Sequence, residues 1–252
     1  MKKKLFSLLS ILIIFLGCKE EVEYTLSPTS VSINAADTYN LEVSPASDSW
    51  TFETENKWIT TVTSKGIITA DRVGSTNIVV KNTDNNYVAK CRVTVLPNYS
   101  MYKDPYLTLG VSKSTVKSFE KRALYSEATD NLIYNGENAT LTNLIYLFEN
   151  TKLRSIGCIV PTSYSSLMGS FLAERYVYLG ESDDILIFVT PDFKIAIGAS
   201  VVSIYSWMII YMENSETLQT ANVQMDNLLI NKLGSKASLL LNNTFKNIEI
   251  KK

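Results

Sequence analysis

Few side chains in this sequence have a type and spacing suited to catalysis. The 252 residues include no histidine, which excludes His-ligated zinc and the usual forms of Ser-His-Asp and Cys-His catalysis. Asp183 and Asp184 are adjacent carboxylates, which we interpret as a turn because aspartate favours turns. Residues 84–86 are rich in oxygen but lack the pattern and closing glutamate of a calcium loop. We therefore predict no catalytic residue, metal site or cofactor, and no enzymatic activity.

The three cysteines stand in different surroundings. Cys91 and Cys158 lie within apolar strand-like runs, and we expect buried thiols that act as small hydrophobes. Cys18 follows a charged start, an apolar run from Leu5 to Leu16, and Gly17. This order is typical of a signal peptide, and the run is shorter than the roughly 20 residues that a membrane span needs.

The segment that ends at Cys18 resembles the lipobox of bacterial lipoproteins, although Phe15 stands where leucine is usual. The resemblance implies that residues 1–17 are removed, that Cys18 carries palmitate or a related lipid, and that the membrane is a partner through this lipid. Lys19, Glu20 and Glu21 resemble the export tag of Bacteroidota surface lipoproteins, which implies an outer-membrane protein facing the cell exterior. A secretory signal with a chance cysteine, an uncleaved anchor and a solvated acidic linker remain alternatives.

Charge argues against one class of partner. Without the three N-terminal lysines, the chain has 21 basic against 25 acidic residues. No basic patch stands out, so we expect no nucleic-acid partner. The length after residue 17 suffices for two domains of ordinary size.

Residues 24–97, after an anchor and linker at 18–23, alternate between apolar and polar side chains with a period of two, which predicts about seven short strands. The turn signals between them favour an all-β sandwich. Trp50, Phe52 and Trp58 fit either its core or a carbohydrate-binding platform, and the shared parity of Trp50 and Phe52 favours the core.

The same stretch resembles the group 2 bacterial Ig-like domain. The resemblance is carried by the opening Leu26-Ser27-Pro28-Thr29-Ser30-Val31, by Trp58, by Gly66-Ile67-Ile68-Thr69-Ala70, by Gly74-Ser75-Thr76 and by the final strand at 89–95. It implies an Ig-like fold used as a spacer or binding module on bacterial surfaces, with no catalytic residues.

Residues 99–214 change character, and we predict an α+β domain with a mainly antiparallel sheet and two helices on one face. One helix is expected over 114–124 with Ser112 or Ser114 as N-cap, and another after Pro161. Three strands follow each helix, which makes two helix-βββ units and a weak internal repeat. In this repeat Phe119-Glu120-Lys121-Arg122 corresponds to the segment 171–175, and we expect the charged residues of both segments on solvated helix faces.

One predicted strand has two apolar faces. Tyr205, Trp207 and Tyr211 share one parity, while Met208, Ile210 and Met212 share the other. Because one face suffices to meet the helices, the three aromatic residues form a candidate binding surface. Burial against the other domain or against the tail is the alternative.

The polar tail, 215–252, gives a weaker pattern. Four apolar residues predict a short helix that ends at Gly234, and residues 239–241 predict a strand; the helix residues are Val223, Leu228, Leu229 and Leu233. The whole pattern leads us to expect a non-catalytic surface lipoprotein for adhesion or ligand binding, with a host protein, a neighbouring surface protein or a glycan as partner. A glycan-binding or glycan-processing accessory protein and a structural partner of an envelope assembly remain alternatives.

Overall fold

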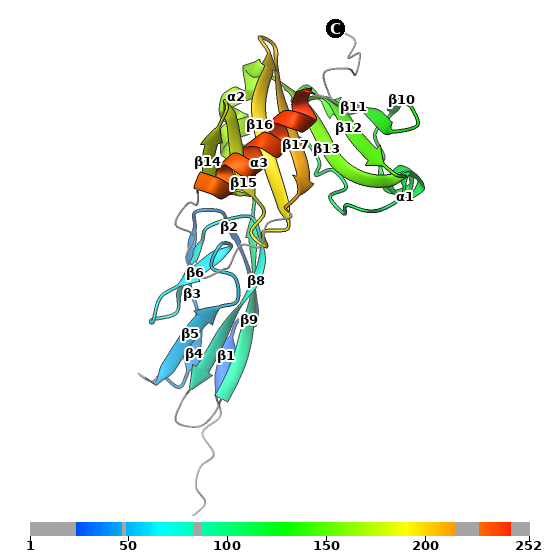
Figure 1. Cartoon of the computed structure of the whole chain (residues 1–252). Coiled ribbons are helices and arrows are strands. Elements are labelled where there is room, and N and C mark those ends of the chain that lie inside the picture. The colour runs from blue at the N-terminus through cyan, green and yellow to red at the C-terminus, as the bar shows by residue number, and fades with distance from the viewer. Residues whose placement is uncertain (1–23, 47–48, 83–86, 215–226, 243–252) are drawn as a thin grey trace, which may run out of the picture.

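A computed structural model describes residues 24–46, 49–82, 87–214 and 227–242. The chain forms two parts that lie end to end (Figure 1). Cys18 and the tag Lys19-Glu20-Glu21 lie outside the described residues, as do the oxygen-rich residues 84–86 and Val223. In the described part of the chain, no helix has the length and apolar character that crossing a membrane requires.

In the first part, every regular element among the described residues is a strand. One sheet has the order β2-β9-β8-β5, a second has the order β3-β7-β6, and a short ribbon pairs β1 with β4. The strands are β1 (Thr25–Ser27), β2 (Ser30–Asn34), β3 (Thr38–Asn40), β4 (Glu42–Ser44), β5 (Trp50–Thr54), β6 (Thr60–Val62), β7 (Ile67–Ala70), β8 (Gly74–Asn82) and β9 (Tyr87–Leu96).

The sheets share one hydrophobic core, to which strands of both contribute. Strand β8 shows the reason, since every second residue from Thr76 to Asn82 is buried, as period-two alternation requires. Trp50 is buried, and Phe52 packs against the same core. The arrangement is consistent with the predicted Ig-like sandwich and confirms the core interpretation of these two aromatic residues.

The second part is one antiparallel sheet of eight strands in the order β10-β11-β12-β13-β17-β16-β15-β14. Its strands are β10 (Leu124–Glu127), β11 (Asn131–Asn138), β12 (Leu141–Glu149), β13 (Lys152–Pro161), β14 (Val177–Ser182), β15 (Ile185–Val189), β16 (Ile195–Ser203) and β17 (Ser206–Glu213). Its helices are α1 (Lys113–Phe119), the 3-10 turn η1 (Thr162–Tyr164), α2 (Ser165–Ala173) and α3 (Asn227–Leu240).

The chain order repeats once in this sheet. A helix and four strands, α1 to β13, are followed by a second helix and four strands, α2 to β17, and the two units meet where β13 pairs with β17. The predicted units lacked β10 and β14, the two edge strands. All four residues of β10 are exposed, and β14 is interrupted by a register shift beside Gly180. Neither strand therefore shows a clean apolar alternation.

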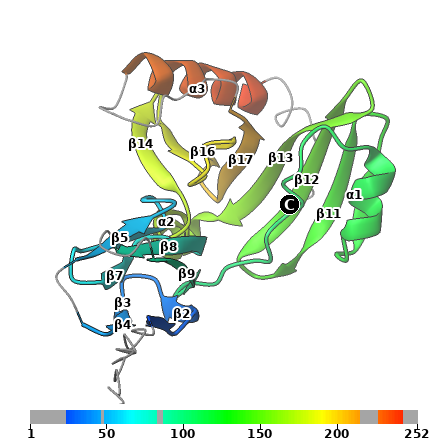
Figure 2. The ribbon, with the colours of Figure 1, turned by 90° about the horizontal axis from the view of Figure 1, so that it is seen from below.

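The two faces of this sheet carry different helices. Val116 of α1 and Phe171 of α2 join one core cluster with one face of the sheet. The opposite face packs under α3 (Figure 2), where Ile230, Leu233 and Ala237 join residues of β14 to β17. The tail sequence predicted a short helix here, but its position on the second face of the sheet was not predicted.

The end predicted for α3 was wrong. Gly234 lies inside the helix, which continues to Leu240, so residues 239–241 do not begin a strand. A Cβ atom on Gly234 would lie 2.7 Å from Cβ of Ser182, and one on Gly198 would lie 2.8 Å from Cβ of Ala237. Gly234 thus serves close packing of helix on sheet and does not end the helix.

The two parts meet through specific contacts. The backbone N–H of Val73 donates to the carbonyl of Glu174 at 2.7 Å, and Arg72 Nε donates to the carbonyl of Tyr176 at 3.2 Å. Trp58 packs edge-on against Phe193 with ring centroids 5.5 Å apart. Trp58 therefore belongs to the junction, neither to the sandwich core nor to an exposed platform.

Candidate functional site

The three aromatic residues predicted as a binding surface belong to the β16–β17 hairpin, and the structure separates them. Tyr211 is fully buried. Its hydroxyl lies 3.1 Å from that of Tyr102, and burial raises its pKa well above the ordinary value, as does the neighbouring Tyr102. The prediction that Tyr211 lies on an exposed surface was wrong, because α1, α2 and the segment at Met101–Tyr102 cover its face of the sheet.

Trp207 anchors the hairpin instead of offering a contact surface. It is partly buried against the core, and its Nε1 donates to Ser165 Oγ at 2.8 Å. Ser165 Oγ donates in turn to the carbonyl of Thr162 at 2.6 Å. Trp207 thereby fixes the hairpin to the start of α2.

The tip of the hairpin carries exposed apolar side chains. Ile204 is 79% and Tyr205 is 72% exposed, and Val201 and Val202 beside them are exposed as well. The backbone carbonyl of Tyr205 accepts from the N–H of Thr162 at 3.0 Å, and that of Ile204 accepts from Thr162 Oγ1 at 3.1 Å. The tip backbone is therefore held in place, which lowers the entropic cost of binding a partner there.

This tip lies at the end of the molecule opposite the sandwich (Figure 1). Strand β16 begins at Ile195, two residues after the junction residue Phe193. At about 3.3 Å per residue its last residue, Ser203, lies about 26 Å farther out. The first described strand, β1, lies at the other end of the molecule. We call Val201, Val202, Ile204 and Tyr205 the distal tip.

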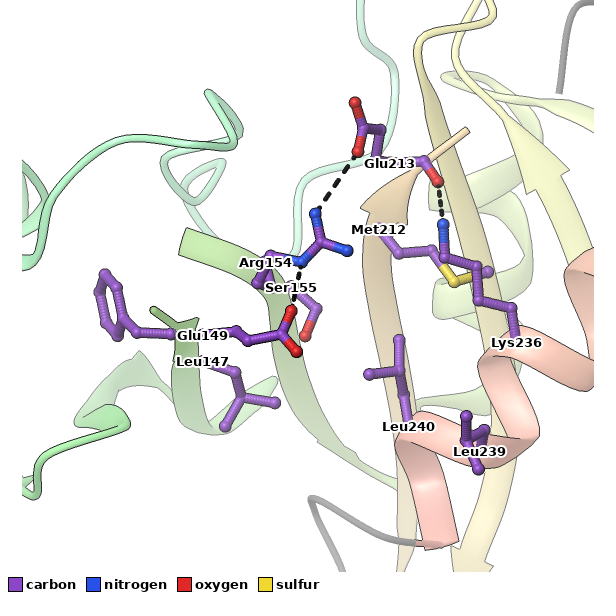
Figure 3. Close-up of a pocket in the computed structure, with 10 residues that line it drawn as sticks. Leu147, Glu149, Arg154, Ser155, Met212, Glu213, Lys236, Leu239 and Leu240 are labelled. Atoms are coloured by element: carbon purple, nitrogen blue, oxygen red, sulfur yellow. Dashed lines mark hydrogen bonds and ion pairs between the residues drawn. The ribbon is translucent and has the colours of Figure 1, made fainter. Parts of the chain in front are cut away.

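A cavity of about 340 Å³ lies beneath the C-terminal half of α3. Its floor is one row of paired residues across three strands: Leu147 on β12, Ser155 on β13 and Met212 on β17. Leu239 and Leu240 of α3 form an apolar wall (Figure 3). A cavity of this size is at the small end of the range for ligand sites.

The rim of this cavity is charged but balanced. Arg154 Nε lies 3.0 Å from Glu149 Oε2, and its Nη1 lies 3.6 Å from Glu213 Oε2. Lys236 Nζ donates to the backbone carbonyl of Glu213 at 2.6 Å. The rim thus carries two cations and two carboxylates, with Arg154 between the carboxylates and Lys236 at a backbone carbonyl (Figure 3). The rim favours neither an anion nor a cation.

Lys121 is exposed, as predicted for the charged residues of the internal repeat, but the other four charged residues are buried or half-buried, contrary to the prediction. Glu120 and Glu174 are each 8% exposed, and each is the C-cap residue of its helix. Glu120 is paired with Arg122 at 2.9 Å, and Glu174 is paired with Arg175. These carboxylates are buried because each is paired with an arginine, so the expectation that charged residues lie on solvated helix faces fails here.

The remaining predicted residues take structural roles. Cys91 and Cys158 are free and buried, as expected, and burial raises the pKa of Cys158 to about 12. Asp183 and Asp184 form the turn between β14 and β15, with φ of 52° and 60°. Among the residues that the structure describes, no group of three or more His, Cys, Asp or Glu side chains is placed to hold a metal ion.

No protein-family model and no curated protein sequence matches the chain. Solved structures with some likeness include an intimin mutant from EHEC O157:H7, with 10% identity over 71% of this chain and 86% of that chain, at a TM-score of 0.24. Domains 5–6 of the S-layer protein SbsC show 11% identity over 77% of this chain and 85% of that chain, at a TM-score of 0.24. Domains 4–9 of SbsC show 10% identity over 78% of this chain and 27% of that chain, at a TM-score of 0.25. Likeness at these scores supports no inference about function.

Proposed function

We propose that the chain is a non-catalytic, lipid-anchored protein of the outer-membrane surface that presents its distal tip to a partner. The observation that carries this proposal is the opposite placement of β1 and the distal tip along the molecule (Figure 1). A lipid on Cys18, seven residues before Thr25, would tether the sandwich end. The eight-stranded sheet would then face away from the membrane.

The junction supports this arrangement because it couples the two parts firmly. Besides the Trp58–Phe193 contact, Asn56 Nδ2 donates to the carbonyl of Pro191 at 3.2 Å. The carboxylate of Glu174 accepts from the backbone N–H groups of Asn98 and Tyr99 at 2.9 and 3.0 Å. A sandwich coupled in this way acts as a rigid spacer.

The distal tip fits an apolar patch on a partner protein. The hairpin from Ile195 to Met212 carries no charged side chain, so burying it removes no charge from water. Because hydrogen bonds to Thr162 fix the backbone of the distal tip, its exposed Ile204 and Tyr205 are suited to adhesion to a host or neighbouring surface protein.

Two measurements on whole cells test the proposal. Protease added outside should digest the intact chain, and Cys18→Ala should abolish both palmitate labelling and membrane retention. Full protection from protease would remove the surface assignment. Retained labelling in Cys18→Ala would remove the lipid assignment.

A matched pair of variants tests the tip. Ile204→Ser with Tyr205→Ser should abolish cell adhesion without changing the melting temperature. Val88→Ser is the control, because Val88 is 59% exposed but lies on strand β9 of the sandwich. Equal adhesion by both variants would exclude the distal tip as the contact surface.

A further inference from the structure

The cavity beneath α3 holds a buried hydroxyl group that lacks a hydrogen-bond partner. Ser155 is 1% exposed, and its Oγ has no partner in the described part of the chain. Most buried polar atoms in proteins are paired, and an unpaired one costs about 1–3 kcal/mol. Figure 3 shows the Ser155 side chain directed into the space between Leu147 and Leu240. The hydroxyl thus lacks a partner among the described residues and points toward the cavity.

The other residues that line the cavity restrict the kind of ligand that could pair with this hydroxyl. Leu147, Met212 and the two leucines of α3 form apolar surface around the hydroxyl, which favours a ligand with an apolar body. A charged ligand meets two cations and two carboxylates at the rim, so it gains no net attraction and still loses hydration. The volume of about 340 Å³ restricts the ligand to a small molecule.

We propose that this cavity binds a small uncharged amphiphile whose single hydroxyl or carbonyl group pairs with Ser155 Oγ. The apolar body of the ligand lies along Leu147 and Met212 under the wall of α3. The site is separate from the distal tip, and it does not depend on the lipid anchor or on the adhesive role.

Titration calorimetry on the chain without residues 1–17 tests the proposal, with n-octanol as the probe. Octanoate and octylammonium serve as charged probes of the same chain length. We expect n-octanol to bind at least tenfold more tightly than either ion. Failure of n-octanol to bind, or equal binding of the ions, would overturn the proposal.

Two variants separate the hydroxyl from a general loss of folding. Ser155→Ala should weaken n-octanol binding about fivefold, the value of one neutral hydrogen bond. Thr76→Val is the matched control, since Thr76 Oγ1 is also buried without a partner among the described residues but lies in the sandwich, on β8. It should leave binding unchanged. Unchanged binding in Ser155→Ala with native circular dichroism would overturn the role of Ser155.

Discussion

Glu120 and Glu174 end helices α1 and α2 in matching ways. Each is the buried C-cap residue of its helix, and each carboxylate accepts hydrogen bonds from two consecutive backbone N–H groups. Glu120 binds those of Lys121 and Arg122, and Glu174 binds those of Asn98 and Tyr99. The two repeats thus share a device, but the second repeat uses it to hold the sandwich in place.

Replacing Glu174 should therefore weaken the junction. Glu174→Gln removes the negative charge and replaces one of the two carboxylate oxygens that accept the hydrogen bonds from Asn98 and Tyr99. We expect a loss of about 2 kcal/mol in the free energy of unfolding. Limited proteolysis should also cut faster near Asn98. Glu181→Gln, on the exposed part of β14, is the control and should change stability by less than about 0.5 kcal/mol. If Glu174→Gln changes stability as little as Glu181→Gln does, the sandwich is held in place by other contacts.

The ion pair between Arg122 and Glu137 should make stability depend on acid pH. Burial raises the pKa of Glu137, but the hydrogen bonds from Arg122 and from the backbone N–H of Lys103 lower it more, so the net shift is downward. The contribution is therefore complete above the ordinary carboxyl pKa of 4.5 and is lost as the pH falls through the lower folded value.

Urea unfolding at a series of pH values checks this dependence. Glu137→Gln should cost about 1–2 kcal/mol at neutral pH, and its difference from the parent chain should shrink below pH 4.5. Glu42→Gln on exposed strand β4 is the control and should show a small difference at every pH. A constant difference for Glu137→Gln would contradict the assigned shift.

Alanine at Gly234 should destabilise the chain, although alanine is the better helix former. The gain in helix propensity is about 1 kcal/mol, but a Cβ atom there would meet Ser182 Cβ at 2.7 Å and Oγ at 2.8 Å. Overpacking of this kind costs about 1–3 kcal/mol, so we expect a net loss in thermal or urea unfolding.

Gly169 in α2 is the matched control for that substitution. A Cβ atom on Gly169 would meet nothing within 4 Å, so Gly169→Ala should raise the free energy of unfolding by up to about 1 kcal/mol. Stabilisation by both substitutions would show that α3 shifts away from the sheet at no cost.

The two buried hydroxyl groups without partners predict a gain in stability. Ser155→Ala and Thr76→Val each remove a buried group that has no hydrogen-bond partner among the described residues, and each should raise the free energy of unfolding by about 1 kcal/mol without ligand. In chemical denaturation the two effects should add, because the sites lie in separate cores. A loss of stability in either variant would show that its hydroxyl is paired in solution, for example with water.

Local sequence determined most of the strands and the core of the sandwich. Alternation along β8 and β9 places Ile78, Val80, Cys91 and Val93 in one core, and a capping serine starts α1 at Lys113. These features follow from the backbone periodicities of 2.0 and 3.6 residues, which are properties of short segments. The absence of histidine likewise excludes several reaction classes by composition alone.

Only the tertiary structure decided what covers each apolar face. Alternation in β17 showed that both faces are apolar, but not that Tyr211 packs beneath α1 and α2 while Met212 packs beneath α3. Sequence also could not show that Glu120 and Glu174 are buried, because each has partners distant in the chain. Glu174 accepts from the backbone N–H groups of Asn98 and Tyr99, and Glu120 accepts from the hydroxyl of Tyr146. Burial depends on which segments meet, and the pairing of β13 with β17 and the approach of α3 are set by contacts across the whole domain. The exposure of Ile204 and Tyr205 at the distal tip likewise depends on where the segments that pack on the sheet end.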